Sequence, residues 1–399
     1  MTLQRRNASI GVFTDQDPMT QDELEVTQDV AAAGHAPGLP PWTIAAPVFG
    51  GAVLAGTLLG LGGFYVALLG IGLAVCVFAS VYHAETIAHR VGEPYGTLVL
   101  ALAVTLIEVA LIISLMLGGG PDTATLARDT IFAAVMIILT AIVGLSLFMG
   151  GLKYREQEFG LDGTTAALVA LAAIVVLTLV FPNYTETPGP YYSSSQLAFI
   201  SVISLVIYGS FVFAQTVSNR PLFVTEGLSS DGAGGGDADP VHAHPPPSNK
   251  VALASTVLLL LCLTAVVLLA KKIAPSLEAA VERVGAPNSV VGVIIAAIVL
   301  LPEGLSAVAA ARDNRLQTSL NLALGSALAS IGLTIPAVGA LAIYLGIPLA
   351  LGIDSRSTVL LILALFTASL ALRTGRTIVL HGIVLLVIFA VYLFMTIVP

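Results

Sequence analysis

Repeated runs of about twenty apolar residues constrain this chain more than any other feature of its sequence. A helix needs roughly 20 apolar residues to cross the hydrocarbon core of a bilayer, and such runs follow one another from residue 43 to residue 398. Only 10% of the residues are charged, against about 25% in soluble globular domains. A soluble fold could not cover its surface with so few charges. The sequence therefore predicts an all-α polytopic membrane protein.

The apolar runs predict about eleven transmembrane helices separated by short polar breaks. The predicted spans are 43–61, 64–84, 95–117, 128–150, 163–181, 196–217, 251–270, 288–311, 318–345, 357–372 and 377–398. Two polar segments stand apart from them. The acidic start of the chain, 1–41, has no signal-peptide pattern and is typical of a disordered tail. Gly, Pro and Ser crowd the segment 218–250, which indicates a flexible cytoplasmic linker.

An internal repeat divides the apolar part of the chain. The segment RVGEP (90–94) recurs as RVGAP (283–287), and each copy precedes a long span with one glutamate, Glu108 or Glu303. Five spans per copy is an odd number, so the second copy must cross the membrane in the opposite direction. Inverted repeats of this kind are a recurring construction of secondary transporters. The predicted order is therefore one span followed by two inverted five-helix repeats with a linker between them. The first span covers 42–62, the first repeat 63–217, the linker 218–250 and the second repeat 251–399.

The distribution of Lys and Arg predicts the orientation. Cytoplasmic loops carry an excess of these residues. With the N-terminus inside, the cytoplasmic set is Arg5, Arg6, Arg90, Lys153, Arg155, Arg220, Lys250, Arg312, Arg315, Arg373 and Arg376. The outer set is Arg128, Lys271, Lys272, Arg283 and Arg356. The larger first set favours a cytoplasmic N-terminus and an external C-terminus.

Glu108 and Glu303 are the candidate chemical groups, because each lies near the middle of its span. An ionised carboxylate at that depth costs at least about 2.5–3.5 kcal/mol. No Lys or Arg lies at comparable depth, so protons or metal ions must neutralise these groups. A site that accepts two protons or one divalent cation is the minimum requirement of an antiporter. Structural use of a protonated glutamate is the alternative, and it suits one such residue better than a repeat-related pair.

Residues with hydroxyl groups are candidate ligands beside the two glutamates. Ser319, Ser326, Ser330 and Thr334 form one stripe on the span after Glu303. Thr105 and Thr140 are the candidates in the first repeat. Hydroxyl oxygens are hard ligands that suit Ca²⁺, Na⁺ or K⁺, although serines at helix contacts also serve in packing. Pro302 removes one backbone donor beside Glu303, which predicts a broken helix with carbonyls exposed as further ligands.

His83 and Glu85 are candidate proton-relay residues at the end of the second span. A polar cluster at a helix end without a role in transport is an equally good interpretation. Cys76 and Cys262 lie inside apolar runs, with no disulfide or zinc spacing.

At these residues the chain resembles the calcium/cation antiporter superfamily, and most of all its bacterial ChaA-type calcium/proton antiporters. The segments that carry the resemblance are 92–112, 292–314 and 324–336, within a layout that matches over 42–399. The resemblance implies two inverted repeats with one cation-binding acid each, which are Glu108 and Glu303. It also implies roles for Gly325, Ser326 and Ser330, and a location in the bacterial inner membrane. Many members carry Gly-Asn where this chain has Val104-Thr105 and Val299-Leu300.

The expected function is alternating-access export of Ca²⁺ in exchange for H⁺. Na⁺/H⁺ or K⁺/H⁺ antiport on the same scaffold is the first alternative, and a passive channel or an intramembrane enzyme is more remote. An intramembrane protease needs a paired nucleophile and base or an HExxH motif, and no span holds them. The expected partners are membrane lipid and the transported inorganic cations, not nucleic acid; no resident cofactor is expected, and the oligomeric state stays open.

Overall fold

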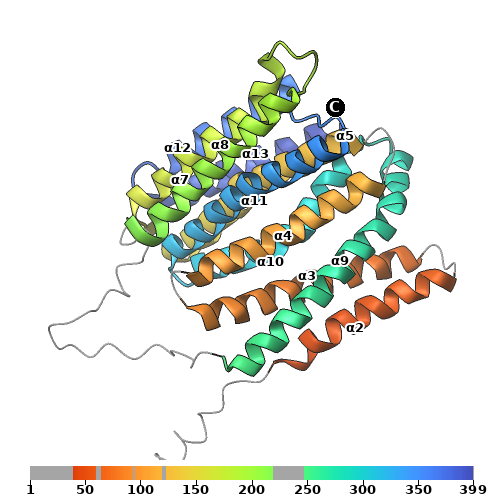
Figure 1. The fold of residues 1–399 in the computed structure, drawn as a ribbon. Helices are drawn as coiled ribbons and strands as arrows, with labels where there is room; N and C mark the ends of the chain where they lie inside the picture. The colour runs from red at the N-terminus through yellow and green to blue at the C-terminus, as the bar shows by residue number, and fades with distance from the viewer. Residues whose placement is uncertain (1–38, 60–63, 93–94, 119–122, 219–246, 399) are drawn as a thin grey trace, which may run out of the picture.

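The computed structural model describes residues 39–59, 64–92, 95–118, 123–218 and 247–398. Most of the predicted N-terminal tail and most of the predicted linker lie outside these ranges, so their predicted disorder stays a prediction. The described chain is almost entirely helical (Figure 1). Its helices are α2 (Pro41–Gly56), α3 (Phe64–Val91), α4 (Tyr95–Gly118), α5 (Thr123–Met136), α6 (Val143–Tyr154), α7 (Leu161–Val175), α8 (Ser194–Phe213), α9 (Asn249–Arg283), α10 (Ser289–Arg312), α11 (Leu316–Leu345), α12 (Ser355–Leu372) and α13 (Val379–Ile397).

Three of the membrane helices change their winding along their length. The π-helical segment η2 (Ile137–Ile142) joins α5 to α6 in one continuous helix, η3 (Val176–Val180) extends α7 and η5 (Ala214–Ser218) extends α8. Two short 3₁₀ turns complete the set, η1 (Thr57–Leu59) and η4 (Phe181–Tyr184). With α5 and α6 counted as one, the described residues form eleven helices, as the apolar runs predict.

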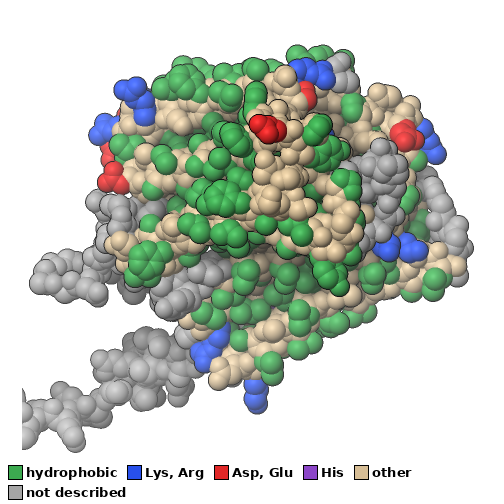
Figure 2. Space-filling model, turned by 45° about the horizontal axis from the view of Figure 1, so that its top comes forward, with side chains coloured by type: hydrophobic (Ala, Val, Ile, Leu, Met, Phe, Trp, Pro, Cys, Tyr) green, Lys and Arg blue, Asp and Glu red, His purple; other side chains and the backbone are tan. Residues whose placement is uncertain are grey.

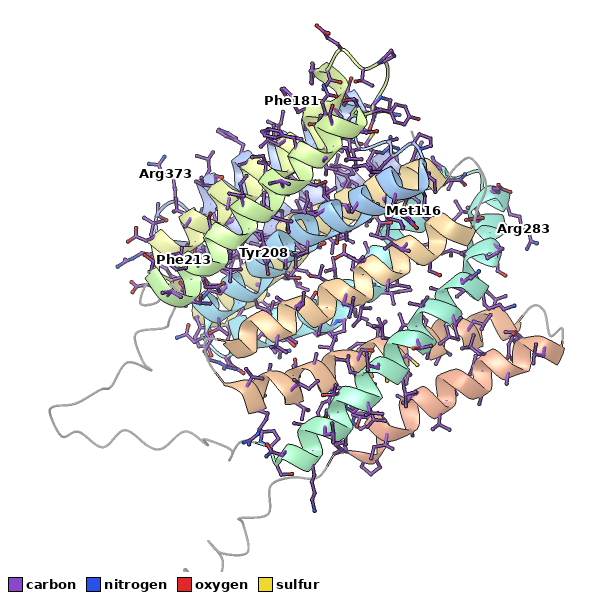
Figure 3. All side chains as sticks on the ribbon, viewed as in Figure 1. Met116, Phe181, Tyr208, Phe213, Arg283 and Arg373 are labelled. Carbon is purple, nitrogen blue, oxygen red and sulfur yellow. The ribbon has the colours of Figure 1, made fainter. Side chains whose placement is uncertain are left out.

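The lengths of the helices suit a bilayer. Within the described ranges, nine helices are long and apolar enough to cross a membrane, while α2 and the stretch Val99–Ser114 of α4 are shorter apolar helices. The exterior agrees with this assignment, because apolar side chains are spread over the visible face and few charged ones lie on it (Figure 2). Figure 3 places Arg373 and Arg283 at opposite ends of the bundle. The fold is that of a polytopic membrane protein, as predicted.

One predicted boundary is wrong by a wide margin. The seventh span was expected to end at residue 270, but α9 continues to Arg283 through Lys271, Lys272 and Pro275. Charged residues end an apolar run without ending a helix, since Lys is a good helix former. The helix ends only where Gly285 adopts a left-handed conformation, with φ +70°.

The helices form layers across the bundle (Figure 1). Helices α2, α3 and α9 pack together on one side, and α7, α8, α12 and α13 lie on the other. Between them run α4, α10, α11 and the α5–α6 helix. We call face A the end of the bundle where α2, α4, α7, α9, α11 and α13 begin, and face B the opposite end. Glu108 and Glu303 lie on the middle helices, away from both faces.

The close contacts between helices follow an inverted repeat. The first helices of the two repeats, α3 and α9, pack on each other. The third helix of each repeat packs against the fifth of the other, α11 with α8 and α6 with α13. Gly92 and Gly285, in the repeated sequence motif, both adopt positive φ, 78° and 70°. The two inverted five-helix repeats are thus present in the fold, while their predicted boundaries remain a prediction.

Face A carries a small β-structure that the sequence pattern did not predict. Strand β1 (Glu156–Glu158), between α6 and α7, pairs antiparallel with β2 (Arg376–Ile378), between α12 and α13. The middle residue of β1, Gln157, is buried and donates hydrogen bonds from Nε2 to the Ala311 carbonyl (2.9 Å) and to Asn314 Oδ1 (3.0 Å). The strand therefore ties the loop after α6 to the end of α10, the helix that carries Glu303.

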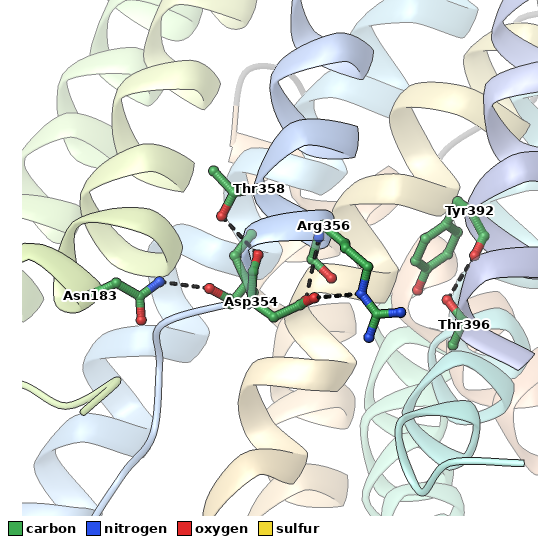
Figure 4. A network of polar contacts seen from close by, with 8 residues as sticks. Asn183, Asp354, Arg356, Thr358, Tyr392 and Thr396 are labelled. Carbon is green, nitrogen blue, oxygen red and sulfur yellow. Dashed lines mark hydrogen bonds and ion pairs between the residues drawn. The ribbon is translucent and has the colours of Figure 1, made fainter. Parts of the chain in front are cut away.

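On face B, the loop between α7 and α8 contacts the loop between α11 and α12 (Figure 4). Asn183 donates to the Ile353 carbonyl (2.6 Å), and Arg128 donates to the Gly352 carbonyl (3.2 Å). Asp354 caps α12 by accepting from the Ser357 amide, and Arg356 lies 3.4 Å away. Partial burial raises the pKa of Asp354, but the hydrogen bonds from Ser357 and Arg356 outweigh it and hold the pKa below its usual value.

Candidate cation site

Glu108 lies on α4 and is 5% exposed. Ser330 of α11 donates a hydrogen bond to its Oε1 over 2.6 Å. The two residues are 222 positions apart in the chain and belong to different repeats. This hydrogen bond therefore joins the two repeats at Glu108, and it forms only when the chain is folded.

Glu303 lies on α10 and approaches the same place from the second repeat. Its carboxyl takes a hydrogen bond from Ser326 and is close enough to Glu108 for the two charges to interact. Its other oxygen, Oε2, is buried and has no hydrogen-bond partner among the described residues. A buried carboxylate oxygen without a partner is costly, so this atom is suited to receive a proton or a cation.

Both carboxyl groups are held by a single helix, α11. Ser326 and Ser330 are one turn apart on it and contact Glu303 and Glu108 respectively. Ser319 and Thr334, on the same stripe, are fully buried with hydroxyls that have no partner in the described part of the chain. The predicted stripe thus faces the interior and the two glutamates rather than lipid.

Pro302 does not break α10. The expectation of a broken helix is wrong, because α10 runs continuously over Ser289–Arg312. A proline inside a helix still lacks the amide that would bond the carbonyl four residues earlier. The carbonyl deprived of that donor is the one of Ile298, one turn before Glu303.

A cavity of about 10 Å³ adjoins Glu108 on the side toward face B. Its other lining residues are Leu111, Ile112, Thr130, Ala134, Ile295, Ala296, Val299 and Leu300. A larger apolar cavity of about 50 Å³ shares Leu111, Ile295 and Val299 with it and extends between α3, α9 and α10. Both cavities lie on the face B side of Glu303.

The two threonines predicted for the first repeat are placed differently from the serines. Thr105 donates to the Ala101 carbonyl (2.8 Å), and Thr140 donates to the Met136 carbonyl, so each hydroxyl bonds its own helix. Among the described residues, no hydrogen bond connects either threonine to a glutamate. Their role as cation ligands stays a prediction, and the geometry does not add support to it.

His83 contacts α2, and Glu85 interacts with its own helix, so among the described residues neither is joined to the glutamate pair. His83 is fully buried, its Nε2 lies 3.3 Å from the Thr43 carbonyl, and Glu85 interacts with His89. No hydrogen bond or ion pair within the described ranges joins them to Glu108. A proton relay through these residues stays a prediction without a connecting path.

The described residues contain no group of three or more His, Cys, Asp or Glu side chains able to hold a metal ion. The candidate site therefore has two carboxylates completed by hydroxyls. Such an oxygen-rich, weakly charged set suits a hard cation that is held briefly, and it does not resemble the thiolate and imidazole sets of structural zinc.

The fold and the paired carboxylates define a class, the polytopic exchangers built from inverted repeats. The family model described as sodium/calcium exchanger protein matches residues 60–217 and 254–398, and the chain belongs to this family. It is 46% identical over 366 residues to a putative ionic transporter, y4hA, of Sinorhizobium fredii, covering 90% of this chain and 97% of that protein.

A second relative has a more definite description. The sodium-potassium/proton antiporter ChaA of Escherichia coli is 38% identical over 323 residues, covering 81% of this chain and 86% of that protein. Among solved structures, the H⁺/Ca²⁺ exchanger CAX superposes with a TM-score of 0.64 at 13% identity, covering 88% of this chain and 87% of that one. The first likeness supports the ChaA type and the second supports the fold. The predicted membership of the calcium/cation antiporter superfamily, ChaA type, is confirmed.

Proposed function

We propose that this chain is a secondary cation/proton antiporter in which Glu108 and Glu303 alternately bind protons and a cation, with Ca²⁺ as the first candidate. The observation that supports the proposal is that the two buried carboxyls lie near enough to interact electrostatically, each beside a hydroxyl from α11. Two interacting carboxylates cannot both stay ionised in an apolar interior without a counter-charge. Two protons or one divalent cation balance them equally.

The exchange cycle follows from that balance. Protons leave the carboxyls when the site opens to one face, and the cation takes their place. Ser326 and Ser330 can turn their hydroxyls so that the oxygens face the cation, because a hydroxyl both donates and accepts. The loaded site is again neutral, which allows it to open to the other face, where protons displace the cation. The doubly ionised empty pair is the state that the apolar surroundings disfavour.

The ligand number fits Ca²⁺, which takes 6–8 oxygens. Two oxygens from each carboxylate and one from each serine make six at this site. Na⁺ or K⁺ is the second candidate, because the relative that is 38% identical is a sodium-potassium/proton antiporter. In that case one monovalent cation and one retained proton neutralise the pair.

The charge asymmetry supports a cytoplasmic face A. Within the described residues that face carries Arg90, Lys153, Arg155, Lys250, Arg312, Arg315, Arg373 and Arg376, whereas face B carries Arg128, Lys271, Lys272, Arg283 and Arg356. Short loops rich in Lys and Arg stay inside. We therefore propose a cytoplasmic N-terminus, an external C-terminus, a bacterial plasma membrane and export of the cation driven by proton entry.

Proton flux in inside-out membrane vesicles tests the function. A pH gradient is imposed, and Ca²⁺, Na⁺ or K⁺ is added in turn while an acidity-sensitive dye reports the gradient. We expect Ca²⁺ to dissipate the gradient at micromolar to millimolar concentration. Dissipation by Na⁺ or K⁺ alone would establish the second candidate. If no cation moves protons beyond the level of vesicles lacking the protein, the antiport proposal is wrong.

The Ser330→Ala variant tests the hydroxyl that contacts Glu108. Hydrogen bonds to charged groups contribute about 1.5–3 kcal/mol, and about 1.4 kcal/mol corresponds to tenfold in affinity. We expect the half-saturating cation concentration to rise at least about tenfold. The matched control is Ser201→Ala, since the buried Ser201 hydroxyl donates to the Leu197 carbonyl of its own helix (2.7 Å). Equal effects at the two serines would show that Ser330 has no specific role.

A further inference from the structure

The turn between α10 and α11, residues 313–315, is bound at face A by side chains of the first repeat. Gln157 of β1 donates both hydrogens of its amide there, one to the Ala311 carbonyl and one to Asn314 Oδ1. Two side chains at the end of α6 donate to the last carbonyl of α10. Carbonyls in the last turn of a helix lack their usual partners within it. The first repeat therefore supplies donors to the end of the helix that carries Glu303.

Positive backbone φ angles coincide with this contact. Among the described residues, the non-glycine residues with positive φ are Arg155 and Asn314, at 68° and 58°. Arg155 lies two residues before Gln157, and Asn314 accepts one of the Gln157 hydrogen bonds. A side chain makes positive φ unfavourable, and such strain is commonly kept at sites of function, where the surrounding structure fixes it. The strain therefore indicates that the exact shape of these two turns matters.

The Gln157 side chain fills a space that a glycine leaves open. It is 2% exposed, and a Cβ on Gly150 of α6 would collide with its Oε1 and lie 2.7 Å from its Cδ. The same Oε1 has no hydrogen-bond partner in the described part of the chain. A buried amide with one unpaired end stabilises a fold less than a fully paired one. Stability alone is therefore a poor explanation for this residue.

The second repeat has a different residue at the corresponding position. Gln157, before the fourth helix of the first repeat, pairs with Thr377, before the fifth helix of the second. At face B an isolated antiparallel bridge joins Ala350 and Tyr191, which precede the fourth and fifth helices with the repeats exchanged. Ala350 thus takes the place of Gln157, and its methyl group cannot donate a hydrogen bond. The two faces of the exchanger therefore differ at this position.

The α10–α11 turn sets the relative depth of Glu303 and Ser326. Glu303 lies nine residues before Arg312, the end of α10, and Ser326 lies ten residues after Leu316, the start of α11. At 1.5 Å per residue the two are about 14 and 15 Å from the turn, so they meet at the same depth. A change in the shape of the turn would shift one group past the other.

We propose that Gln157 is a positioning residue of the exchanger: by fixing the shape of the α10–α11 turn, it keeps Glu303 and Ser326 in register for the cation. It acts through the turn and contacts neither of these two side chains. The inference rests on the proposed function, and it adds to the site a residue from a loop at face A.

The Gln157→Met variant tests the proposal, because methionine has a similar length and donates no hydrogen bond. Cation-dependent proton flux is measured in vesicles over a range of Ca²⁺ concentration, or of Na⁺ or K⁺ if wild type uses those. We expect the half-saturating concentration to rise about three- to tenfold, within the range for residues that act on a site without touching it. The maximal rate should stay within about twofold.

The matched control is Thr164→Val on α7, near the same face. It keeps the shape of a buried side chain and removes the hydrogen bond from its hydroxyl to the Gly160 carbonyl (3.1 Å). This bond lies within the first repeat and does not involve the α10–α11 turn. We therefore expect the half-saturating concentration of this variant to equal that of wild type.

Two further variants separate positioning from stability. Gly150→Ala should displace the Gln157 side chain and raise half-saturation as Gln157→Met does, with no further rise in the double variant. Additive rises would contradict the proposal. Asn314→Gly removes one acceptor of Gln157, although glycine suits positive φ better than asparagine does. We expect this variant to raise half-saturation by a smaller factor without lowering the midpoint of thermal unfolding.

The outcomes separate this inference from the function that it rests on. Wild type without cation-coupled proton flux refutes the antiport proposal itself. Flux in wild type, with unchanged half-saturation in Gln157→Met, refutes only the role of Gln157. An equal rise in Thr164→Val, or lower maximal rate and thermal stability without an affinity shift, would also overturn it, because both results indicate general loosening. If the methionine variant does not reach the membrane, Asn314→Gly decides in the same way.

Discussion

Replacing Glu303 by Gln is expected to reduce cation-driven proton flux more than about a hundredfold. Gln keeps the size of the side chain but can neither release a proton nor balance a cation. Losing one partner of a buried charge arrangement costs about 3–5 kcal/mol, which corresponds to two to three and a half powers of ten. The measurement is the initial rate of gradient dissipation at saturating cation, in vesicles with equal amounts of protein.

The matched control is Glu282→Gln on the exposed end of α9. It removes the same charge without touching the pair, and its rate should equal that of wild type. Wild-type coupling in Glu303→Gln would remove this glutamate from the exchange cycle. Loss of coupling together with persistent cation flux would favour the channel interpretation.

The second large effect is expected on stability, at Gly382 of α13. A Cβ there would lie 2.7 Å from the Gly144 carbonyl oxygen and also against the Phe148 backbone nitrogen, both on α6. Backbone atoms cannot move aside as a flexible side chain can. Overpacking costs typically 1–3 kcal/mol and occasionally more, so we expect Gly382→Ala to lose about 3 kcal/mol of stability.

Gly209→Ala is the control for that loss. Gly209 lies in α8, and a Cβ there meets nothing within 4 Å. Alanine in an unhindered helix is about 0.5–1 kcal/mol more favourable than glycine, so this variant should be slightly more stable than wild type. Thermal unfolding in detergent compares the two variants. Equal midpoints would show that α6 and α13 do not cross as closely as described.

Much of the fold was predictable because the bilayer imposes a length and a polarity on each helix. The predicted span 95–117 corresponds to α4 and 357–372 to α12, with ends that differ by one or two residues. The prediction was wrong where a helix continues beyond the end of its apolar run, as α9 does beyond residue 270. It also missed β1 and β2, since EQE and RTI have no local strand pattern and pair across more than 200 residues.

The part of the candidate site that could be predicted is the part that depends on helical periodicity, because the period shows which residues share a face of one helix. The spacing of Ser326 and Ser330 placed them on one face of α11, and both reach a glutamate. Thr140 was chosen as the equivalent of Ser330 in the first repeat. Its hydroxyl donates to the Met136 carbonyl of its own helix and not to a glutamate.

The crossing of the two repeats has a consequence for how the chain becomes a protein. Helix α3 packs on α9, α11 on α8 and α6 on α13, so each five-helix unit finds its closest neighbours in the other. Either unit alone would expose these faces to lipid, as one subunit taken from an obligate two-fold dimer would. Because both units belong to one chain, they are always made in equal number and cannot dissociate, so they need no separate step of subunit recognition.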